Sequence, residues 1–98
     1  MATYDYTNKV AIVTGGGSGI GAACAHTFAR SGARVVVADF DDAAGRRVAD
    51  EIKSADGTAL FIKVDVSDPT QVEEMVAQTV DTFGGLNLAV NNAGIGGA

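Results

Sequence analysis

A chain of 98 residues suits one domain with a modest hydrophobic core and is too short for two. Its 47% hydrophobic and 19% charged residues are typical of a globular protein, whereas the net charge of −5 argues against binding to a nucleic-acid backbone. A single cysteine excludes an intramolecular disulfide, and no apolar stretch approaches the roughly 18 residues of a membrane span. We therefore expect a cytoplasmic protein that binds no metal, nucleic acid or membrane.

Short apolar runs rich in β-branched residues alternate with helical patterns along the chain. Residues 1–8 are expected to form a loose arm before the first strand. Four strands are predicted, at residues 9–14, 34–39, 58–66 and 86–90. Three helices are predicted between them, at residues 20–30, 41–54 and 69–83. In the third helix, Asp68 is the predicted N-cap, Pro69 takes the first helical position, and Gln71 completes a capping box.

The order of these elements determines the expected fold class. Because a single helix separates each strand from the next, the strands cannot form hairpins and are expected to pair in parallel through right-handed crossovers. The fold class is then α/β, a Rossmann-like doubly wound parallel sheet, present in part with four strands. In the order 3-2-1-4, the fourth strand is an open edge, and we expect apolar surface to be exposed there. The first two helices would cover one face of the sheet and the third helix the other.

Residues 14–21, TGGGSGIG, form a glycine-rich loop between the first predicted strand and the first predicted helix. Folding costs more backbone entropy for glycine than for any other residue, so such a run indicates close approach to the backbone. A loop at this place puts free amides and the positive end of a helix at one point, which favours a phosphate group. The spacing is not G-x-G-x-x-G, because the glycines fall at Gly15, Gly19 and Gly21 with Gly16 and Gly17 between them.

Asp39 ends the second predicted strand, about twenty residues beyond the loop. A carboxylate at that point of a doubly wound sheet can accept hydrogen bonds from both hydroxyls of a nucleotide ribose, and it would repel a 2′-phosphate. Ser18 also stands where an arginine could have bound such a phosphate. These residues favour NAD over NADP. The alternative is that Asp39 merely caps the helix that follows it.

Three motifs resemble those of the short-chain dehydrogenase/reductase (SDR) family. Residues 14–21 resemble its T-G-x-x-x-G-[IL]-G fingerprint, residues 91–94 (NNAG) resemble its N-N-A-G motif, and residues 65–66 (DV) resemble its adenine-contacting D-[VL] pair. The resemblance extends from about residue 8 to residue 94 and identifies residues 1–98 as the N-terminal half of a dinucleotide-binding (Rossmann) domain.

The resemblance implies a role in NAD binding for each motif. Residues 15–21 would receive the pyrophosphate and pack the helix on the strand, Asp39 would hold the adenosine ribose, and residues 65–66 would contact the adenine. Residues 92–94 would line the nicotinamide side, and Asn91 would tie the central strands together. The expected cofactor-binding residues are Gly15, Gly17, Ser18, Gly19, Ile20, Gly21, Asp39, Phe40, Asp65, Val66, Asn92, Ala93 and Gly94.

The resemblance also implies an enzyme, an NAD-dependent dehydrogenase that transfers a hydride between NAD(H) and a small alcohol or carbonyl substrate. In this family a tyrosine, a lysine four residues later and a serine handle the proton, because a phenol needs a nearby cation to act as a base at neutral pH. No Tyr-x-x-x-Lys is present, since the two tyrosines are Tyr4 and Tyr6. We expect no catalytic residue in these 98 residues and no turnover by them alone.

Two alternatives stay open at this point. The chain could be a short non-catalytic nucleotide-binding module that pairs with a partner chain across its open sheet edge, or a fragment left by truncation or proteolysis. A homo-oligomer is equally compatible with the sequence.

Overall fold

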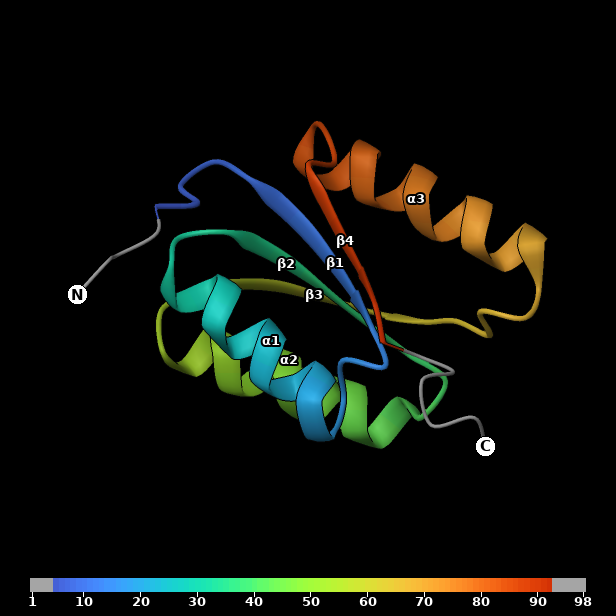
Figure 1. The fold of residues 1–98 in the computed structure, drawn as a ribbon, viewed down its shortest axis with the longest axis horizontal. Helices are drawn as coiled ribbons and strands as arrows, with labels where there is room; N and C mark the ends of the chain where they lie inside the picture. The colour runs from blue at the N-terminus through green and yellow to red at the C-terminus, as the bar shows by residue number, and fades with distance from the viewer. Residues whose placement is uncertain (1–4, 93–98) are drawn as a thin grey trace.

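The computed structural model describes residues 5–92, in which parallel strands and helices alternate along the chain (Figure 1). The strands are β1 (Val10–Thr14), β2 (Arg34–Asp39), β3 (Thr58–Lys63) and β4 (Leu88–Asn91). The helices are α1 (Gly19–Arg30), α2 (Asp42–Ser54) and α3 (Pro69–Phe83). None of these helices in residues 5–92 is long and apolar enough to cross a membrane.

The strands form one parallel sheet in the order β3-β2-β1-β4, which confirms the predicted order. In β1, Val13 pairs with Val37 of β2 on one side and with Val90 of β4 on the other. The chain therefore builds the sheet outward from β1 to β3 and then returns to place β4 on the opposite side of β1. This reversal creates a topological switch point at the carboxyl ends of β1 and β4.

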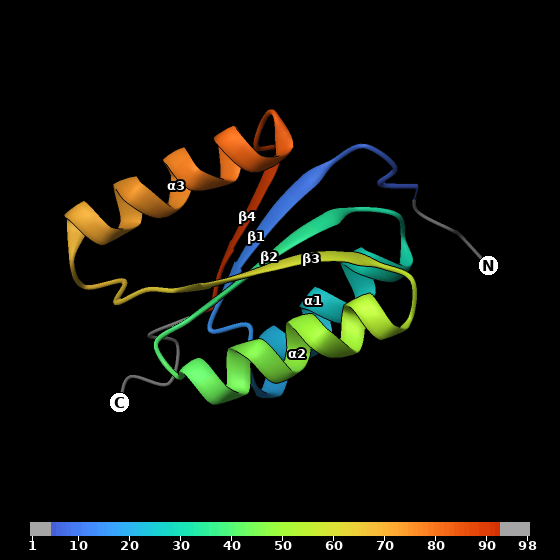
Figure 2. The same cartoon turned by 180° about the vertical axis from the view of Figure 1, so that it is seen from behind.

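The two faces of the sheet are covered unequally, as predicted. Helices α1 and α2 lie side by side on one face and α3 lies on the other (Figures 1 and 2). Alternate residues of the strands point to opposite faces, so Val13 and Val37 pack in the cluster under α1 and α2. Ile12 and Val36 pack with Met75 in the cluster under α3.

The third strand is shorter than the predicted range of 58–66, since it ends at Lys63. Side chains turn the chain out of the ladder just beyond it. The Oδ1 atom of Asp65 accepts hydrogen bonds from the backbone N–H and the hydroxyl of Ser67, and the side-chain oxygen of Gln71 accepts from the backbone N–H of Asp65. The residues that follow β3 therefore form a turn at the carboxyl edge of the sheet.

Helices α2 and α3 begin close to the predicted residues. Asp41 is the N-cap of α2, which starts one residue later than predicted, and its Oδ1 accepts from the backbone N–H of Ala44. Asp68 caps α3 with Pro69 in the first turn. Gln71 does not complete a capping box, because its amide donates to the Asp68 carboxylate while its oxygen faces the preceding turn.

Two further segments differ from the predicted ranges. The strand predicted at 86–90 lies at Leu88–Asn91, where it is an edge strand within the described chain. Of the arm predicted at 1–8, residues 1–4 lie outside the described residues. In its remaining part, the Tyr6 backbone N–H donates to the carbonyl oxygen of Ser31, and the Tyr6 ring packs edge-on against Phe28 with 5.5 Å between ring centroids.

Candidate nucleotide-binding site

The glycine loop leads directly from β1 into α1 and leaves the start of that helix bare. Gly15 and Gly19 have φ angles of 65° and 55°, in the left-handed region that favours glycine. Ser18 is the N-cap, with an extended backbone and no side-chain hydrogen bond to the helix. Ser18, Gly19 and Ile20 are exposed. The first-turn N–H groups, which have no partner within the helix, therefore combine with the positive end of the helix dipole at an accessible point.

Gly21 allows the loop to fold back onto α1. A Cβ atom at Gly21 would overlap the carbonyl oxygen of Gly15 and would lie 2.8 Å from Nδ2 of Asn92. The first turn of α1 therefore touches both the loop and the residue that follows β4. The close contact of Gly21 is with the loop backbone; its expected role in packing the helix on the strand stays a prediction.

Asp39 lies at the end of β2 with its carboxylate against the glycine loop. The backbone N–H of Gly17 donates to Oδ2 and that of Asp41 donates to Oδ1, each over 2.9 Å. The alternative that Asp39 caps the next helix is wrong, because Asp41 is the N-cap of α2. Two amides thus fix the orientation of a half-buried carboxylate, which keeps free lone pairs for further donors.

Apolar side chains are exposed beside this carboxylate. Among residues 5–92 the exposed large hydrophobic side chains are Ile20, Phe40, Val66 and Val80, and the first three follow β1, β2 and β3. Phe40 is 67% exposed, and the ammonium group of Lys63 lies 5.5 Å from the centroid of its ring. Apolar surface gathered at the carboxyl edge of a parallel sheet is typical of a ligand site.

The turn after β3 presents an ionised carboxylate at the same edge. The hydroxyl of Ser67, over 2.6 Å, and its backbone N–H, over 3.0 Å, donate to Oδ1 of Asp65. These bonds favour the charged form and hold the pKa of the Asp65 carboxyl below its ordinary value. Because both bonds go to Oδ1, Oδ2 keeps its lone pairs for a ligand donor.

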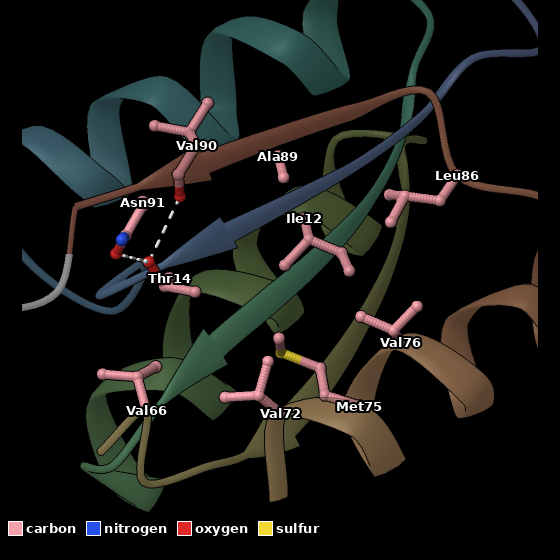
Figure 3. A pocket seen from close by; sticks show the side chains of 10 residues that line it. All are labelled: Ile12, Thr14, Val66, Val72, Met75, Val76, Leu86, Ala89, Val90 and Asn91. Carbon is pink, nitrogen blue, oxygen red and sulfur yellow. Dashed lines mark hydrogen bonds between the residues drawn. The ribbon is translucent and has the colours of Figure 1, made fainter. Parts of the chain in front are cut away.

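Thr14 joins the ends of β1 and β4 at the switch point, as Figure 3 shows. Its Oγ1 lies 3.2 Å from the carbonyl oxygen of Val90 and 3.1 Å from Oδ1 of Asn91, and it accepts a hydrogen bond from the backbone N–H of Asn92 over 3.0 Å. Asn91 therefore contributes to a tie between β1 and β4. Ala93 and Gly94 lie outside the described residues.

An apolar cleft of about 290 Å³ opens between the sheet and α3, next to Thr14 (Figure 3). Its apolar walls come from β1, from β4 with the residues before it, from α3 and from the turn after β3. Its lining residues are Ile12, Thr14, Val66, Val72, Met75, Val76, Leu86, Ala89, Val90 and Asn91. Part of the apolar surface of β4 therefore lines this cleft.

The fold brings together nearly all of the predicted site residues that it describes. The glycine loop, Asp39 and Asn92 meet around the start of α1, and Phe40 with residues 65–66 extends the same edge toward β3. Bare amides, a cradle that side chains would fill, a fixed carboxylate and exposed apolar groups fit a nucleotide with a diphosphate. Sequence reasoning missed the role of Thr14, whose only signal was its place at the start of the fingerprint.

The comparisons with known proteins agree with this architecture. A family model described as short chain dehydrogenase matches residues 9–98. A 2,5-dichloro-2,5-cyclohexadiene-1,4-diol dehydrogenase of Sphingobium indicum is 47% identical over 87 residues, which cover 89% of this chain and 35% of that protein. A cyclohexanol dehydrogenase of an Acinetobacter species is 45% identical over 90 residues, or 92% of this chain and 36% of that protein. The chain thus spans about a third of the length of these relatives.

Solved structures give the same result. A hydroxysteroid dehydrogenase from Escherichia coli superposes with a TM-score of 0.90 at 37% identity, covering 94% of this chain and 39% of that one. A short chain dehydrogenase from Mycobacterium avium superposes with a TM-score of 0.86 at 43% identity, covering 97% of this chain and 35% of that one.

Proposed function

Because the chain belongs to the short-chain dehydrogenase family, we propose that it forms the NAD-binding part of an oxidoreductase that transfers a hydride between NAD(H) and a small alcohol or carbonyl substrate. Members of this family bind nicotinamide dinucleotide cofactors. The observation that carries the proposal is the meeting of the bare start of α1 with the Asp39 carboxylate beside the switch point. A cytoplasmic location, and association through β4 or as a homo-oligomer, are expectations that accompany it.

The pyrophosphate is proposed to bind at the start of α1. The uncapped first turn offers backbone N–H donors and a partial positive charge, and no acidic side chain lies in that turn to repel an anion. Gly15 and Gly19 supply the left-handed backbone that turns the chain there, and Ser18 offers an exposed hydroxyl. Gly17 contributes to pyrophosphate binding only indirectly, because its N–H donates to the Asp39 carboxylate.

The adenosine half is proposed to lie over the ends of β2 and β3. Asp39 would accept hydrogen bonds from the ribose hydroxyls, Asp65 would accept from the adenine amino group, and Phe40 and Val66 would supply apolar contact. A 2′-phosphate would meet the charges of Asp39 and the neighbouring Asp41, which supports NAD over NADP. Lys63, which is paired in register with Asp39, is a cation that could attract a 2′-phosphate. Its ammonium group, however, lies over the ring of Phe40.

The nicotinamide half is proposed to lie toward the switch point, along residues 92–94. When bound, the nicotinamide ring supplies the hydride acceptor or donor. Thr14 holds the end of β4 there through Asn92, and this contact orients the backbone that leads into the N-N-A-G motif. The described residues therefore bind and orient a cofactor, and we assign none of them to proton transfer.

The substrate class rests on the relatives. The names of the Sphingobium and Acinetobacter proteins specify alcohols on a six-membered carbon ring as what those enzymes oxidise. These names support an alcohol, or the corresponding carbonyl compound, as the substrate of the enzyme to which this site belongs.

Calorimetric titration of the folded chain with NADH and with NADPH tests the proposal. We expect NADH to bind, and NADPH to bind at least about tenfold more weakly because its extra phosphate meets Asp39. Gly19→Val is the matched loop variant: its φ of 55° strains a β-branched residue at the proposed pyrophosphate contact, so NADH affinity falls. A wild-type chain that is folded by circular dichroism and takes up neither nucleotide would contradict the proposal.

A further inference from the structure

Gly45 is the fourth residue of α2, inside the helix, where glycine is destabilising relative to alanine. The reason for it is a contact with β3. A Cβ atom at Gly45 would overlap Cε1 of the Phe61 ring and would lie 2.5 Å from Cδ1 of the same ring. Only a residue without a side chain lets α2 approach β3 this closely.

The backbone of α2 at this point also touches the glycine loop. A Cβ atom at Gly17 would lie 2.7 Å from the backbone nitrogen of Gly45 and 2.8 Å from the carbonyl carbon of Ala44. Gly17 in turn donates its N–H to Asp39. One turn of α2 is therefore packed between the aromatic ring of β3 and the loop that borders the proposed pyrophosphate site.

Both amide donors to the Asp39 carboxylate depend on where α2 sits. Gly17 lies against the α2 backbone, and Asp41, which donates to the other carboxylate oxygen, is the N-cap of α2 itself. The Phe61 ring packs against the core cluster under α1 and α2, and the guanidinium of Arg46 lies 5.1 Å from its centroid. A side chain at position 45 would therefore require α2 or the Phe61 ring to move.

We propose that Gly45 is a positioning residue for the cofactor. By letting α2 pack against the Phe61 ring, it brings Gly17 and Asp41 within hydrogen-bond distance of Asp39. It thereby fixes the carboxylate that is proposed to bind the ribose hydroxyls. This inference rests on the proposed function, since the ribose contact belongs to that proposal. The steric chain from Phe61 through Gly45 to Gly17 is independent of it.

A size-compensating pair of variants tests the inference. Gly45→Ala adds the methyl group, and Gly45→Ala/Phe61→Leu adds it while removing the ring atoms that it would overlap. Two quantities are measured: amide hydrogen exchange of Gly17 by NMR, and NADH affinity by calorimetry. In Gly45→Ala we expect Gly17 to exchange at least about tenfold faster, because its bond to a charged acceptor is weakened, and NADH to bind about tenfold more weakly.

The double variant is expected to return both values close to those of the wild type. Phe83→Ala, which removes packing on the opposite face of the sheet and lies outside the cleft, is the control for a general loss of stability. This variant should have a lower melting temperature. Titrated at a temperature where it is still folded, it should bind NADH with the affinity of the wild type. Unchanged Gly17 exchange in a folded Gly45→Ala chain would overturn the inference, as would a folded double variant in which neither value recovers.

Two further outcomes, a Gly45→Ala chain that does not fold and a wild-type chain that binds no NADH, also test the inference. If Gly45→Ala does not fold, the double variant carries the test, and it must fold and match the wild type in both measurements. If the wild-type chain binds no NADH, the proposed function fails while the exchange rate of Gly17 still decides whether Gly45 positions the Asp39 contact.

Discussion

The backbone N–H of Gly17 donates to Oδ2 of Asp39 across 2.9 Å, so the glycine loop and the end of β2 are joined directly. Asp41 donates to the other oxygen at the same distance. The two amides belong to the connections that follow β1 and β2. A carboxylate held in this way has its orientation set before any ligand arrives, and this reduces the ordering cost of binding.

Replacement of this carboxylate should change both affinity and selectivity for the cofactor. We expect Asp39→Ala to weaken NADH binding by roughly tenfold to a hundredfold, which corresponds to the loss of hydrogen bonds to a charged acceptor. NADPH affinity should fall less or rise, because repulsion of its 2′-phosphate is removed together with those bonds. Calorimetric titration with both nucleotides gives the ratio of the two dissociation constants.

Asp81→Ala is the charge-matched control for this experiment, because Asp81 is exposed near the end of α3, at the opposite end of that helix from the turn after β3. It removes the same charge and should leave the ratio unchanged. Equal NADH affinity in Asp39→Ala and the wild type would remove Asp39 from the site.

A methyl group at Gly21 should destabilise the chain far more than one at Gly85. At Gly21 it would overlap the Gly15 carbonyl oxygen, whereas nothing lies within 4 Å of a Cβ at Gly85. We expect Gly21→Ala to lower the free energy of unfolding by about 1–3 kcal/mol, as overpacking does, and Gly85→Ala to change it by no more than about 0.5 kcal/mol. Urea denaturation followed by circular dichroism measures both, and similar midpoints for the two variants would refute the close contact.

Most of the fold could be predicted from the sequence, because the patterns that indicate its strands and helices are local. Runs such as residues 34–39 are apolar and β-branched over the whole length of a strand, and the single helices between strands leave only parallel pairing. The end of β3 was not accessible in this way. Residues 58–66 read as one strand, yet Ser67 and Gln71 capture Asp65 and end the ladder at Lys63.

The candidate site likewise contains features that could be predicted from the sequence and features that could not. The glycine loop and Asp39 were predictable, because a strand–loop–helix order and a strand-end carboxylate are visible in the sequence. The contact between Gly45 and Phe61 was not, because it joins a helix and a strand through the absence of a side chain. No periodic pattern distinguishes such a glycine from one that is merely tolerated.

Thr14 should stabilise the junction of β1 and β4 through its hydroxyl rather than its shape. In Thr14→Val the backbone N–H of Asn92 loses its acceptor, and we expect the free energy of unfolding to fall by roughly 1–3 kcal/mol. Thr14→Ser keeps the hydroxyl and should retain most of the stability. Urea denaturation of the three chains gives the comparison. A valine variant as stable as the wild type would mean that the hydroxyl contributes nothing to the junction.

The turn at Asp65 should depend on pH in a direction that its hydrogen bonds determine. Because the hydroxyl and backbone N–H of Ser67 favour the charged form, the pKa of the Asp65 carboxyl is lower in the folded chain than in the unfolded chain. A carboxyl of this kind stabilises the folded state above its unfolded pKa of about 4, and the contribution is lost as the pH falls through the lower, folded pKa.

An NMR titration of the Asp65 carboxyl carbon, in the folded chain and in urea, should therefore give the lower midpoint for the folded chain. Ser67→Ala should raise that midpoint toward the ordinary value without reaching it, because the hydroxyl, which is the larger cause, is lost while the backbone N–H remains. Ser54→Ala, at the exposed end of α2, serves as the control and should leave the midpoint unchanged. If Ser67→Ala titrates like the wild type, the hydroxyl does not hold the carboxylate in its charged form.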